Sequence, residues 1–245
     1  MQIIKSRLFE KFPEIVFGIS TKIGTVNNSP FHFNLSLTVG DDPEIVKSNR
    51  EAFFNELGLT TAQIAIQKQV HSEVIALIDA PGPAGESDGM ITDKFNLGLA
   101  VSTADCVPIF IYDKNKKVIC GIHSGWRGTQ KQILKKSLNL LSERFNSNPQ
   151  DLYIFVGPSI SQKNYEVGEE VASQFNRKYS MMINGKLSLD VVQANLDFIY
   201  DFGIPESQVE VSNLCSFNEN ELLHSFRRDG KISGRSLGVI AMRKI

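Results

Sequence analysis

Short apolar runs that alternate with polar residues recur along the chain and predict β-strands. Successive side chains of a strand point to opposite faces, so a half-buried strand alternates between apolar and polar positions. We predict extended structure for residues 14–20, 64–78, 97–103, 117–123, 152–157 and 236–242. The turn-forming residues from Asp79 to Gly89 lie between two of these segments and predict a long loop.

Three other segments repeat their apolar residues at a spacing near 3.6, which predicts helices over residues 43–57, 129–145 and 189–202. The first helix is the best delimited, because Asp42 can cap its N-terminus, Pro43 takes its first position and Gly58 follows its end. Its apolar arc also contains Arg50. This guanidinium either extends into water while its stem packs, or binds an anion in a pocket.

Strands and helices are interspersed, and no repeat or linker rich in proline, glycine and serine divides the chain, so we predict a single domain over residues 1–245. In segment 64–78, strand alternation places four polar side chains on one face, namely Gln67, Gln69, His71 and Glu73. Such a face indicates either solvent or a functional site.

The composition describes a nearly neutral chain of 245 residues, with 26 lysines and arginines against 27 aspartates and glutamates. This balance leaves no large basic field for nucleic acid or for an anionic membrane. Three cysteines argue against a disulfide framework and for a reducing compartment. Because neither a secretory signal nor a membrane-spanning apolar run is found, we expect a cytoplasmic protein.

Several short motif matches are rejected, because the other residues that each motif requires are missing. Residues 234–238 fit the GxSxG nucleophile elbow, but no acidic residue or histidine follows Ser236 to complete that triad. There is no GxGxxG, and neither Gly-Lys pair is followed by the serine or threonine of a P-loop. His71-Ser72-Glu73 matches half of the zinc-deaminase signature, and the PCxxC half is missing.

Three segments have a composition that packing alone explains poorly: QVHS around His71, ADCVP around Cys106 and HSGWRGT from His123. Pro108 forces an extended residue before it and donates no amide, which indicates a bulge or a strand edge beside Cys106. A single free cysteine is more often a small buried residue than a ligand.

The segment after His123 is a glycine-rich turn that leads into a helix, which we expect Thr129 to cap. A helix N-terminus together with Arg127 would suit an anion. An ordinary strand-to-helix connection, with Trp126 packed over it, is equally compatible with this sequence.

The other cysteines and histidines have simpler interpretations. Cys120 lies three positions before His123 in the same strand, so it points to the opposite face and belongs to the core. Cys215 is predicted to be structural, His32 to pack in a loop, and His224 to lie at the surface. One chemically coherent cluster remains, made of His71, Cys106 and His123. Its wide spacing along the chain lacks the compactness of a zinc finger.

Taken in order, the motifs resemble those of one family. They are QVHS, SDGMIT, VSTADCVPIF, GIHSGWRGT, VGPSISQKNYEVG and SFRRDGKISGR, preceded by GDDPEIVKSNR. The chain closely resembles the YfiH-type family, also named the laccase-domain or polyphenol oxidoreductase family and later described as purine nucleoside phosphorylases. The resemblance extends from about Val16 to the C-terminus. It departs mildly at Ser72, Ser124 and Lys22, where the family usually has Gly, Ala and Arg.

The resemblance implies a fold and a metal site. The fold is α+β, a single domain of two mixed β-sheets packed together with flanking helices, an α/β/β/α sandwich. The cofactor is a catalytic Zn2+, with copper as the second choice, and its ligands match His71, Cys106 and His123. Three protein ligands and an open fourth position are typical of catalytic zinc.

The resemblance also implies enzymes that cleave adenosine, inosine, guanosine or methylthioadenosine with phosphate and that deaminate adenosine. We therefore expect a purine nucleoside and phosphate as partners. A multicopper laccase needs more imidazole ligands than four histidines supply, which argues against the older family name.

Phosphorolysis and deamination each need further side chains. Cations must clamp phosphate, and the candidates are Arg50, Arg127 and Arg228. A proton carrier must assist a zinc-bound hydroxide, and the candidates are Glu73, Asp88 and Asp105. Gln69, on the predicted face of His71, could hydrogen-bond a ligand or the metal-bound water.

Two other classes of function stay open. Cys106 could be the nucleophile of a Cys-His hydrolase, with His71 or His123 as its base. The protein could also be a non-enzymatic module whose zinc only stabilises the fold or a partner-binding surface. The family resembles factors implicated in cell-wall precursor editing as well. The oligomeric state is open, with a monomer as the simplest expectation.

Overall fold

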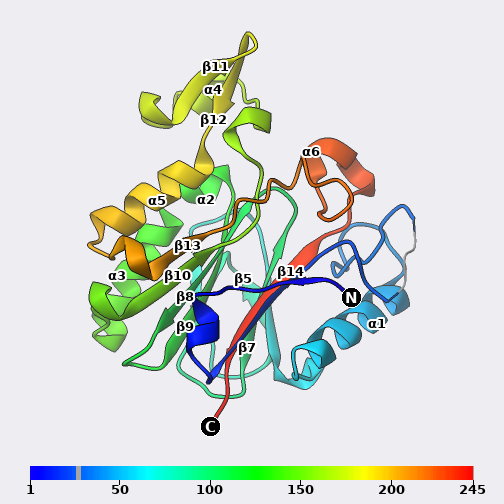
Figure 1. The fold of residues 1–245 in the computed structure, drawn as a ribbon, viewed down its shortest axis with the longest axis vertical. Coiled ribbons are helices and arrows are strands. Elements are labelled where there is room, and N and C mark those ends of the chain that lie inside the picture. The colour runs from blue at the N-terminus through cyan, green and yellow to red at the C-terminus, as the bar shows by residue number, and fades with distance from the viewer. Residues whose placement is uncertain (26–28, 245) are drawn as a thin grey trace.

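Two six-stranded mixed β-sheets form the centre of the molecule (Figure 1). The computed structural model describes residues 1–25 and 29–244. The first sheet has the order β1 (Ile3–Ile4), β2 (Ile15–Ser20), β14 (Ser236–Met242), β7 (Gly98–Thr103), β3 (Ile64–Lys68) and β5 (Gly82–Glu86). The second has the order β13 (Val209–Val211), β10 (Leu152–Val156), β8 (Val107–Asp113), β9 (Val118–Ser124), β6 (Gly89–Thr92) and β4 (Ile75–Leu77).

α1 (Pro43–Glu56) covers the outer face of the first sheet, and α3 (Ile133–Phe145) and α5 (Val191–Asp201) cover the outer face of the second. The short helices are α2 (Trp126–Gln130), α4 (Glu169–Ala172) and α6 (Phe226–Asp229). Single 3-10 turns occur at Phe9–Lys11, Thr61–Gln63, Pro149–Asp151, Gln162–Asn164 (η4), Arg177–Tyr179, Glu206–Gln208 and Gly230–Ile232. The predicted α/β/β/α sandwich of one domain is confirmed.

The apolar core has three layers, one between the sheets and one under each set of helices. Phe17 of β2 and Phe110 of β8 meet between the sheets, with ring centroids 5.1 Å apart. Phe53 of α1 packs on the outer face of the first sheet, and Leu138 of α3 packs on the second. Cys120 lies in this last layer and is fully buried, so its predicted place in the core is confirmed.

The predicted strand over 64–78 is wrong in its middle. β3 ends at Lys68 in the first sheet, and β4 begins at Ile75 in the second, so residues 69–74 cross from one sheet to the other. Of the four polar residues predicted to share one face, only Gln67 lies in a strand, because β3 ends at Lys68. The predicted common face therefore does not exist. The predicted loop from Asp79 to Gly89 is also wrong, because it contains β5, which pairs in parallel with β3.

The helix predicted over 129–145 is two helices, because Gln132 adopts a left-handed φ of 62° between α2 and α3. Thr129 does not cap a helix: the N-cap of α2 is Gly125, and the Thr129 hydroxyl donates to the Gly125 carbonyl. The bulge or strand edge predicted beside Cys106 is also wrong. β8 is an interior strand that pairs with β9 without a register shift, and Pro108 is tolerated because it precedes Ile109, the first residue of β8 that pairs with β10.

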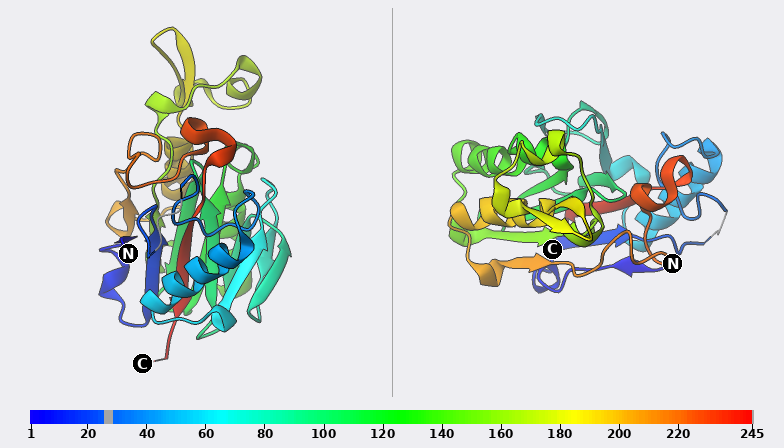
Figure 2. Two further views of the ribbon diagram at one scale, coloured as in Figure 1. Left: turned by 90° about the vertical axis from the view of Figure 1, so that its right-hand side faces the viewer. Right: turned by 90° about the horizontal axis from the view of Figure 1, so that it is seen from above.

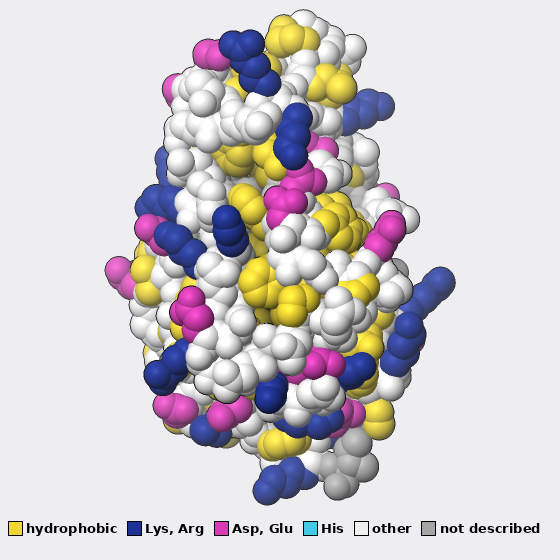
Figure 3. All heavy atoms as spheres, turned by 90° about the vertical axis from the view of Figure 1, so that its left-hand side faces the viewer, with side chains coloured by type: hydrophobic (Ala, Val, Ile, Leu, Met, Phe, Trp, Pro, Cys, Tyr) yellow, Lys and Arg dark blue, Asp and Glu magenta, His cyan; other side chains and the backbone are white. Residues whose placement is uncertain are grey.

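One segment leaves the sandwich between β10 and α5. It contains α4 and the two-stranded hairpin of β11 (Ser180–Ile183) and β12 (Lys186–Leu189), which projects from the top of Figure 1 and stands clear of the sheets in the left view of Figure 2. Figure 3 shows acidic and basic side chains interspersed over one face, with no field of one sign there. No helix in the described ranges is long and apolar enough to cross a membrane.

Candidate metal centre

His71, Cys106 and His123 come together at one end of the sandwich, with their ligand atoms all within 4.8 Å of one another. His71 lies in the crossover from β3 to β4, and Cys106 lies in the crossover from β7 to β8. Both crossovers run from the first sheet to the second. His123 comes from β9 of the second sheet, so the topology alone assembles three ligands that are far apart in the sequence.

The three side chains differ in burial, which gives the cluster an inside and an outside. His123 is 4% exposed, Cys106 is half-buried and His71 is exposed. The two imidazole rings meet edge to face, with centroids 4.9 Å apart. The cluster is therefore enclosed on the His123 side and open to solvent on the His71 side, where a substrate could reach it.

Asp88, immediately before β6, fixes both histidines. Its fully buried carboxylate lies 2.8 Å from His123 Nδ1 and accepts hydrogen bonds from the amides of Val70, His71 and Ser72 and from the Ser72 hydroxyl. Burial raises the pKa of Asp88, but hydrogen bonds from His123 and Ser72 outweigh it and lower the pKa to about 2. Because Nδ1 of His123 is engaged, Nε2 is left to face the cluster.

The backbone near the three ligands has two residues with positive φ and one glycine in close contact with the ligand side chains. His71 has a φ of 58° and Asp105 has a φ of 90°, conformations that cost a residue with a Cβ about 1–3 kcal/mol. At Gly125, an added Cβ would lie 2.9 Å from Cys106 Sγ and 3.1 Å from His71 Cδ2. Only glycine fits there without displacing two of the three ligands.

Cys106 and His123 shift each other's pKa. Burial raises the pKa of the Cys106 thiol, but the charge of His123 and hydrogen bonds from both histidines lower it to about 6. Burial lowers the pKa of His123, whereas the Cys106 thiolate and Asp88 raise it to about 9. Each charge stabilises the other, which favours the thiolate and the imidazolium, and the thiolate is the form that binds a metal or attacks an electrophile.

The donor set fits one metal ion. A thiolate and two imidazole nitrogens suit zinc or copper, and the spacing lets a single ion reach all three after small side-chain rotations. In the part of the chain that the structure describes, no other group of three His, Cys, Asp or Glu side chains is placed to hold an ion. His224, predicted at the surface, is instead buried, with Nε2 3.4 Å from the Phe33 carbonyl oxygen. That surface prediction is wrong.

Several predicted site residues already have protein partners. Gln69 forms two hydrogen bonds with the backbone of Ser102 in β7, at 2.8 and 2.7 Å. Glu73 forms an ion pair with Lys131. Arg50 donates from Nε to the Leu35 carbonyl and is half-buried. The roles predicted for these residues in catalysis stay predictions, but their observed contacts hold loops in place.

Asp105, next to the ligand Cys106, fastens the C-terminal segment to the centre. Its carboxylate accepts hydrogen bonds from the hydroxyls of Ser216 and Ser225 and from the Arg227 amide, at 2.6 to 2.7 Å. The turn that carries a metal ligand is thus tied directly to α6. A displacement of the turn at Asp105 should therefore move α6, and a displacement of α6 should move this turn.

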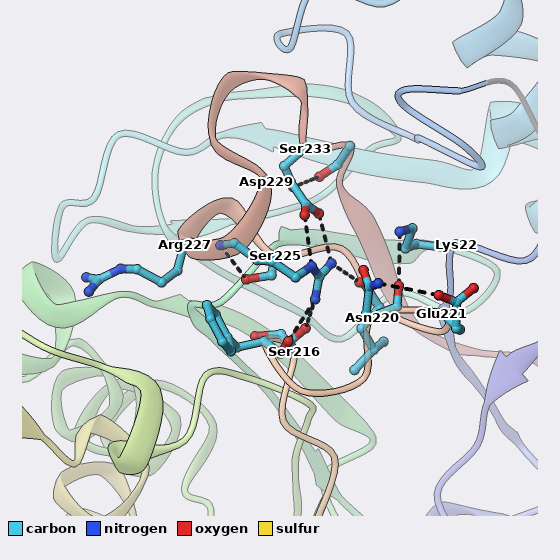
Figure 4. A network of polar contacts seen from close by, with 12 residues as sticks. Lys22, Ser216, Asn220, Glu221, Ser225, Arg227, Asp229 and Ser233 are labelled. Atoms are coloured by element: carbon cyan, nitrogen blue, oxygen red, sulfur yellow. Dashed lines mark hydrogen bonds and ion pairs between the residues drawn. The ribbon is translucent and has the colours of Figure 1, made fainter. Parts of the chain in front are cut away.

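Arg228 is saturated by contacts within the same segment (Figure 4). It donates twice to the Asp229 carboxylate and also to three carbonyls, those of Ser216, Phe217 and Leu223. Arg227 behaves differently, since its labelled side chain extends away from this network in Figure 4. Its guanidinium donates to the Glu166 carbonyl and lies 5.1 Å from the centroid of the Tyr165 ring.

Sequence reasoning missed three side chains beside the centre: Tyr165, Arg227 and Arg235. The negative charge of Cys106 acts on the pKa of both Tyr165 and Arg235, and Arg127 and Arg227 both act on Tyr165. We call Arg127, Arg227, Arg235 and Tyr165 the arginine wall. Its members come from α2, α6, the residue before β14 and the residue after η4. The motifs NYEVG and SFRRDG contained this signal, but the sequence alone singled out Arg228 instead.

Comparison with known proteins agrees with this structure. Residues 16–243 match the family model described as multi-copper polyphenol oxidoreductase laccase. A protein of Bacteroides thetaiotaomicron named purine nucleoside phosphorylase is 34% identical over 95% of this chain and 93% of its own length. Purine nucleoside phosphorylase YlmD of Bacillus subtilis is 31% identical over 94% of this chain and 90% of its own.

A solved structure shows the same fold. The crystal structure of the hypothetical protein YfiH from Bacillus licheniformis superposes with a TM-score of 0.90 at 29% identity, and covers 96% of this chain and 95% of that one. The arrangement of sheets and helices described above is therefore common to both proteins.

Proposed function

The chain belongs to the family described as multi-copper polyphenol oxidoreductase laccase, and within it we propose that this protein is a metal-dependent purine nucleoside phosphorylase. One observation carries the proposal: a Cys-His-His cluster, open on one side, is bordered by arginines that suit phosphate. The names of the curated relatives point the same way. The proposed substrates are adenosine, inosine, guanosine and methylthioadenosine, each with phosphate.

The same geometry argues against oxidation of polyphenols. A multicopper oxidase needs a copper cluster in addition to its thiolate site. The described residues offer one cluster only, and the buried imidazole of His224 lies in a separate polar contact. We propose zinc as the ion, which elemental analysis of protein purified without added metal would test against copper.

In the proposed reaction, a phosphate oxygen attacks C1′ of the ribose. The bond between C1′ and the base nitrogen breaks, and the base leaves with its electron pair and takes up a proton. A bound metal ion would supply Lewis-acid polarisation at an oxygen of the substrate or of water. Arg127 and Arg227 would orient phosphate and neutralise its charge, in a position open to solvent.

The remaining predicted residues would position this machinery. We assign that role to Asp88, which holds the histidines, to Asp105 and Arg228, which hold α6, and to Gln69 and Arg50, which hold neighbouring loops. Adenosine deamination is proposed as a side activity at the same centre. The three cysteines are free thiols, which fits a reducing compartment, and we place the enzyme in the cytoplasm.

The proposal is tested by product analysis. Purified metal-loaded protein is incubated with each nucleoside, with and without phosphate, and the release of free base and ribose 1-phosphate is measured by chromatography. We expect both products only when phosphate is present, and inosine from adenosine as a slower product. If no purine nucleoside yields free base while the metal is bound, the proposed function is wrong.

A second candidate function follows from the contacts of His123. Cys106, His123 and Asp88 are linked in the order nucleophile, base and orienting carboxylate, which is the arrangement of a Cys-His hydrolase. Metal removal separates the two candidates. A phosphorylase should lose activity with chelator and regain it with zinc, whereas a thiol hydrolase should be active without metal and be blocked by iodoacetamide.

A further inference from the structure

Tyr165 has a fixed place at the foot of the projecting hairpin. Its amide donates to the Gln162 carbonyl of η4, and its carbonyl accepts from the Leu189 amide at the end of β12. Its ring is half-buried against the core layer under α3 and α5. The side chain is therefore held by packing and by both sides of its backbone.

Burial and nearby charges of both signs act on the pKa of Tyr165. Burial, Cys106 and Asp105 raise it, and Arg227 and Arg127 lower it. The Arg227 guanidinium lies 5.1 Å from the centroid of the ring. The Arg227 amide donates to Asp105, the neighbour of Cys106, so Arg227 connects Tyr165 with the residues beside the metal centre.

The Tyr165 hydroxyl has no hydrogen-bond partner among the described residues. Of the other tyrosines, the hydroxyls of Tyr112, Tyr153 and Tyr179 each pair with a charged side chain. Tyr200 has no such partner either, but it is 39% exposed on α5, where water can serve. The Tyr165 hydroxyl oxygen is likewise not enclosed by the protein, so it is free to donate to a ligand that arrives from solvent.

We propose that the Tyr165 hydroxyl and the Arg227 guanidinium together bind an oxyanion, which under the proposed function is the phosphate co-substrate. Arg127, Arg227 and Arg235 can only donate hydrogen bonds, so the ligand that satisfies them is one that mainly accepts, as phosphate does. Burial raises the pKa of Tyr165, so its hydroxyl stays protonated and donates as well.

The cation of this pair is already oriented. The Arg227 amide donates to Asp105, and one guanidinium nitrogen donates to the Glu166 carbonyl at 2.7 Å, which leaves Nε and the other terminal nitrogen available. A preorganised pair loses little side-chain entropy when the anion binds. Tyr165 is therefore a substrate-binding residue in this inference.

Calorimetric titration of the metal-loaded protein with inorganic phosphate tests the inference. We expect Tyr165→Phe to weaken phosphate binding about tenfold or more, since a hydrogen bond to a charged ligand is lost. Arg227→Gln should weaken it at least as much. Tyr200→Phe, which removes a surface hydroxyl on α5, is the matched control and should bind phosphate as the wild type does. In kinetics, Tyr165→Phe should raise the KM for phosphate more than it lowers kcat.

The outcomes separate this inference from the proposed function. If Tyr165→Phe binds phosphate as tightly as the wild type, or if only its KM for nucleoside rises, the inference is overturned and phosphorolysis still stands. If the wild type shows no phosphate binding, the inference is overturned too. If phosphate binds through Tyr165 but no nucleoside is cleaved, the oxyanion site is supported and the proposed function fails.

Discussion

The metal centre and the arginine wall are built in opposite ways, although Asp105, the neighbour of Cys106, is bonded to the Arg227 amide. The metal ligands lie at strand ends and sheet crossovers, and Asp88 beneath them is fully buried with several donors on its carboxylate. The arginine wall comes from short helices and loops, and two of its cations are exposed. A metal needs fixed geometry, whereas a substrate must enter and leave, and the two halves suit the roles proposed for them.

Each half depends on one aspartate. Asp88 holds His123 and the turn at His71, and Asp105 holds the segment that carries Arg227. If this division is real, substitutions on the metal side should release metal, and substitutions on the wall side should weaken substrate binding while the metal stays.

Removal of the central ligand should have the largest effect. Cys106→Ala deletes the thiolate that both histidines contact, so we expect zinc affinity to fall by at least about a hundredfold and activity to disappear. Metal content by elemental analysis and base release from inosine measure this. Cys120→Ala, the same change in the core, is the control and should keep both; equal loss in the control would show general destabilisation instead.

Asp88→Asn should come next. The carboxamide keeps the size of the side chain but cannot accept all the hydrogen bonds of the carboxylate, so we expect zinc affinity to fall about tenfold to a hundredfold. A competition titration with a zinc chelator measures it. Normal zinc affinity in this variant would contradict the orienting role of Asp88.

The same variant has a pH signature. The folded pKa of Asp88 lies below its unfolded value of 3.8, so its stabilisation is complete above that value and is lost as pH falls through about 2. The free energy of unfolding of wild type should therefore decrease more steeply than that of Asp88→Asn below about pH 4, as measured by urea denaturation.

Asp105→Asn should affect the other half. The charge that accepts from the Arg227 amide is removed, so α6 should loosen and the KM for phosphate should rise several-fold, with about 1–3 kcal/mol lost locally. Zinc content should stay at the wild-type level. Loss of zinc with unchanged KM would reverse the division between the two halves.

The smallest expected effect is the number of protons released when zinc binds. With Cys106 mostly ionised above about pH 6 and His123 mostly protonated below about pH 9, zinc binding near pH 7.5 should release about one proton, from His123. Zinc affinity should therefore rise with pH until about 9. Calorimetry in buffers of different ionisation enthalpy gives the proton number, and a value near zero would contradict the charge state assigned to the pair.

Hydrophobic periodicity predicted most of the elements that dominate the core, but it missed β8, which is fully buried. β2, β7, β9, β10 and β14 match predicted strands, and α1 begins at Pro43 behind the Asp42 cap as expected. Elements with little apolar pattern were not predictable. β5 consists of glycine, proline, alanine and glutamate, and it is a strand only because β3 offers it an edge to pair with.

The candidate site divides in the same way. The three clustered ligands stand out in the sequence through their residue types, and the structure brings them together. The sequence could not show whether Arg227 or Arg228 is available to a ligand, because neighbouring residues on a short helix point in different directions. The contacts decide it: Arg228 is bonded to Asp229, whereas Arg227 extends to the Glu166 carbonyl. Tyr165 lies within the motif VGPSISQKNYEVG, but nothing in the sequence connected this residue with the three ligands.

The two sheet crossovers also set the order in which the molecule is assembled. Residues 71 and 106 each lie where the chain passes from the first sheet to the second, so neither can meet His123 until both sheets have formed and docked. An unfolded chain or a single sheet offers no complete set of ligands. Under the proposed function, metal would therefore bind late in folding, and a bound metal would show that both sheets have formed and docked.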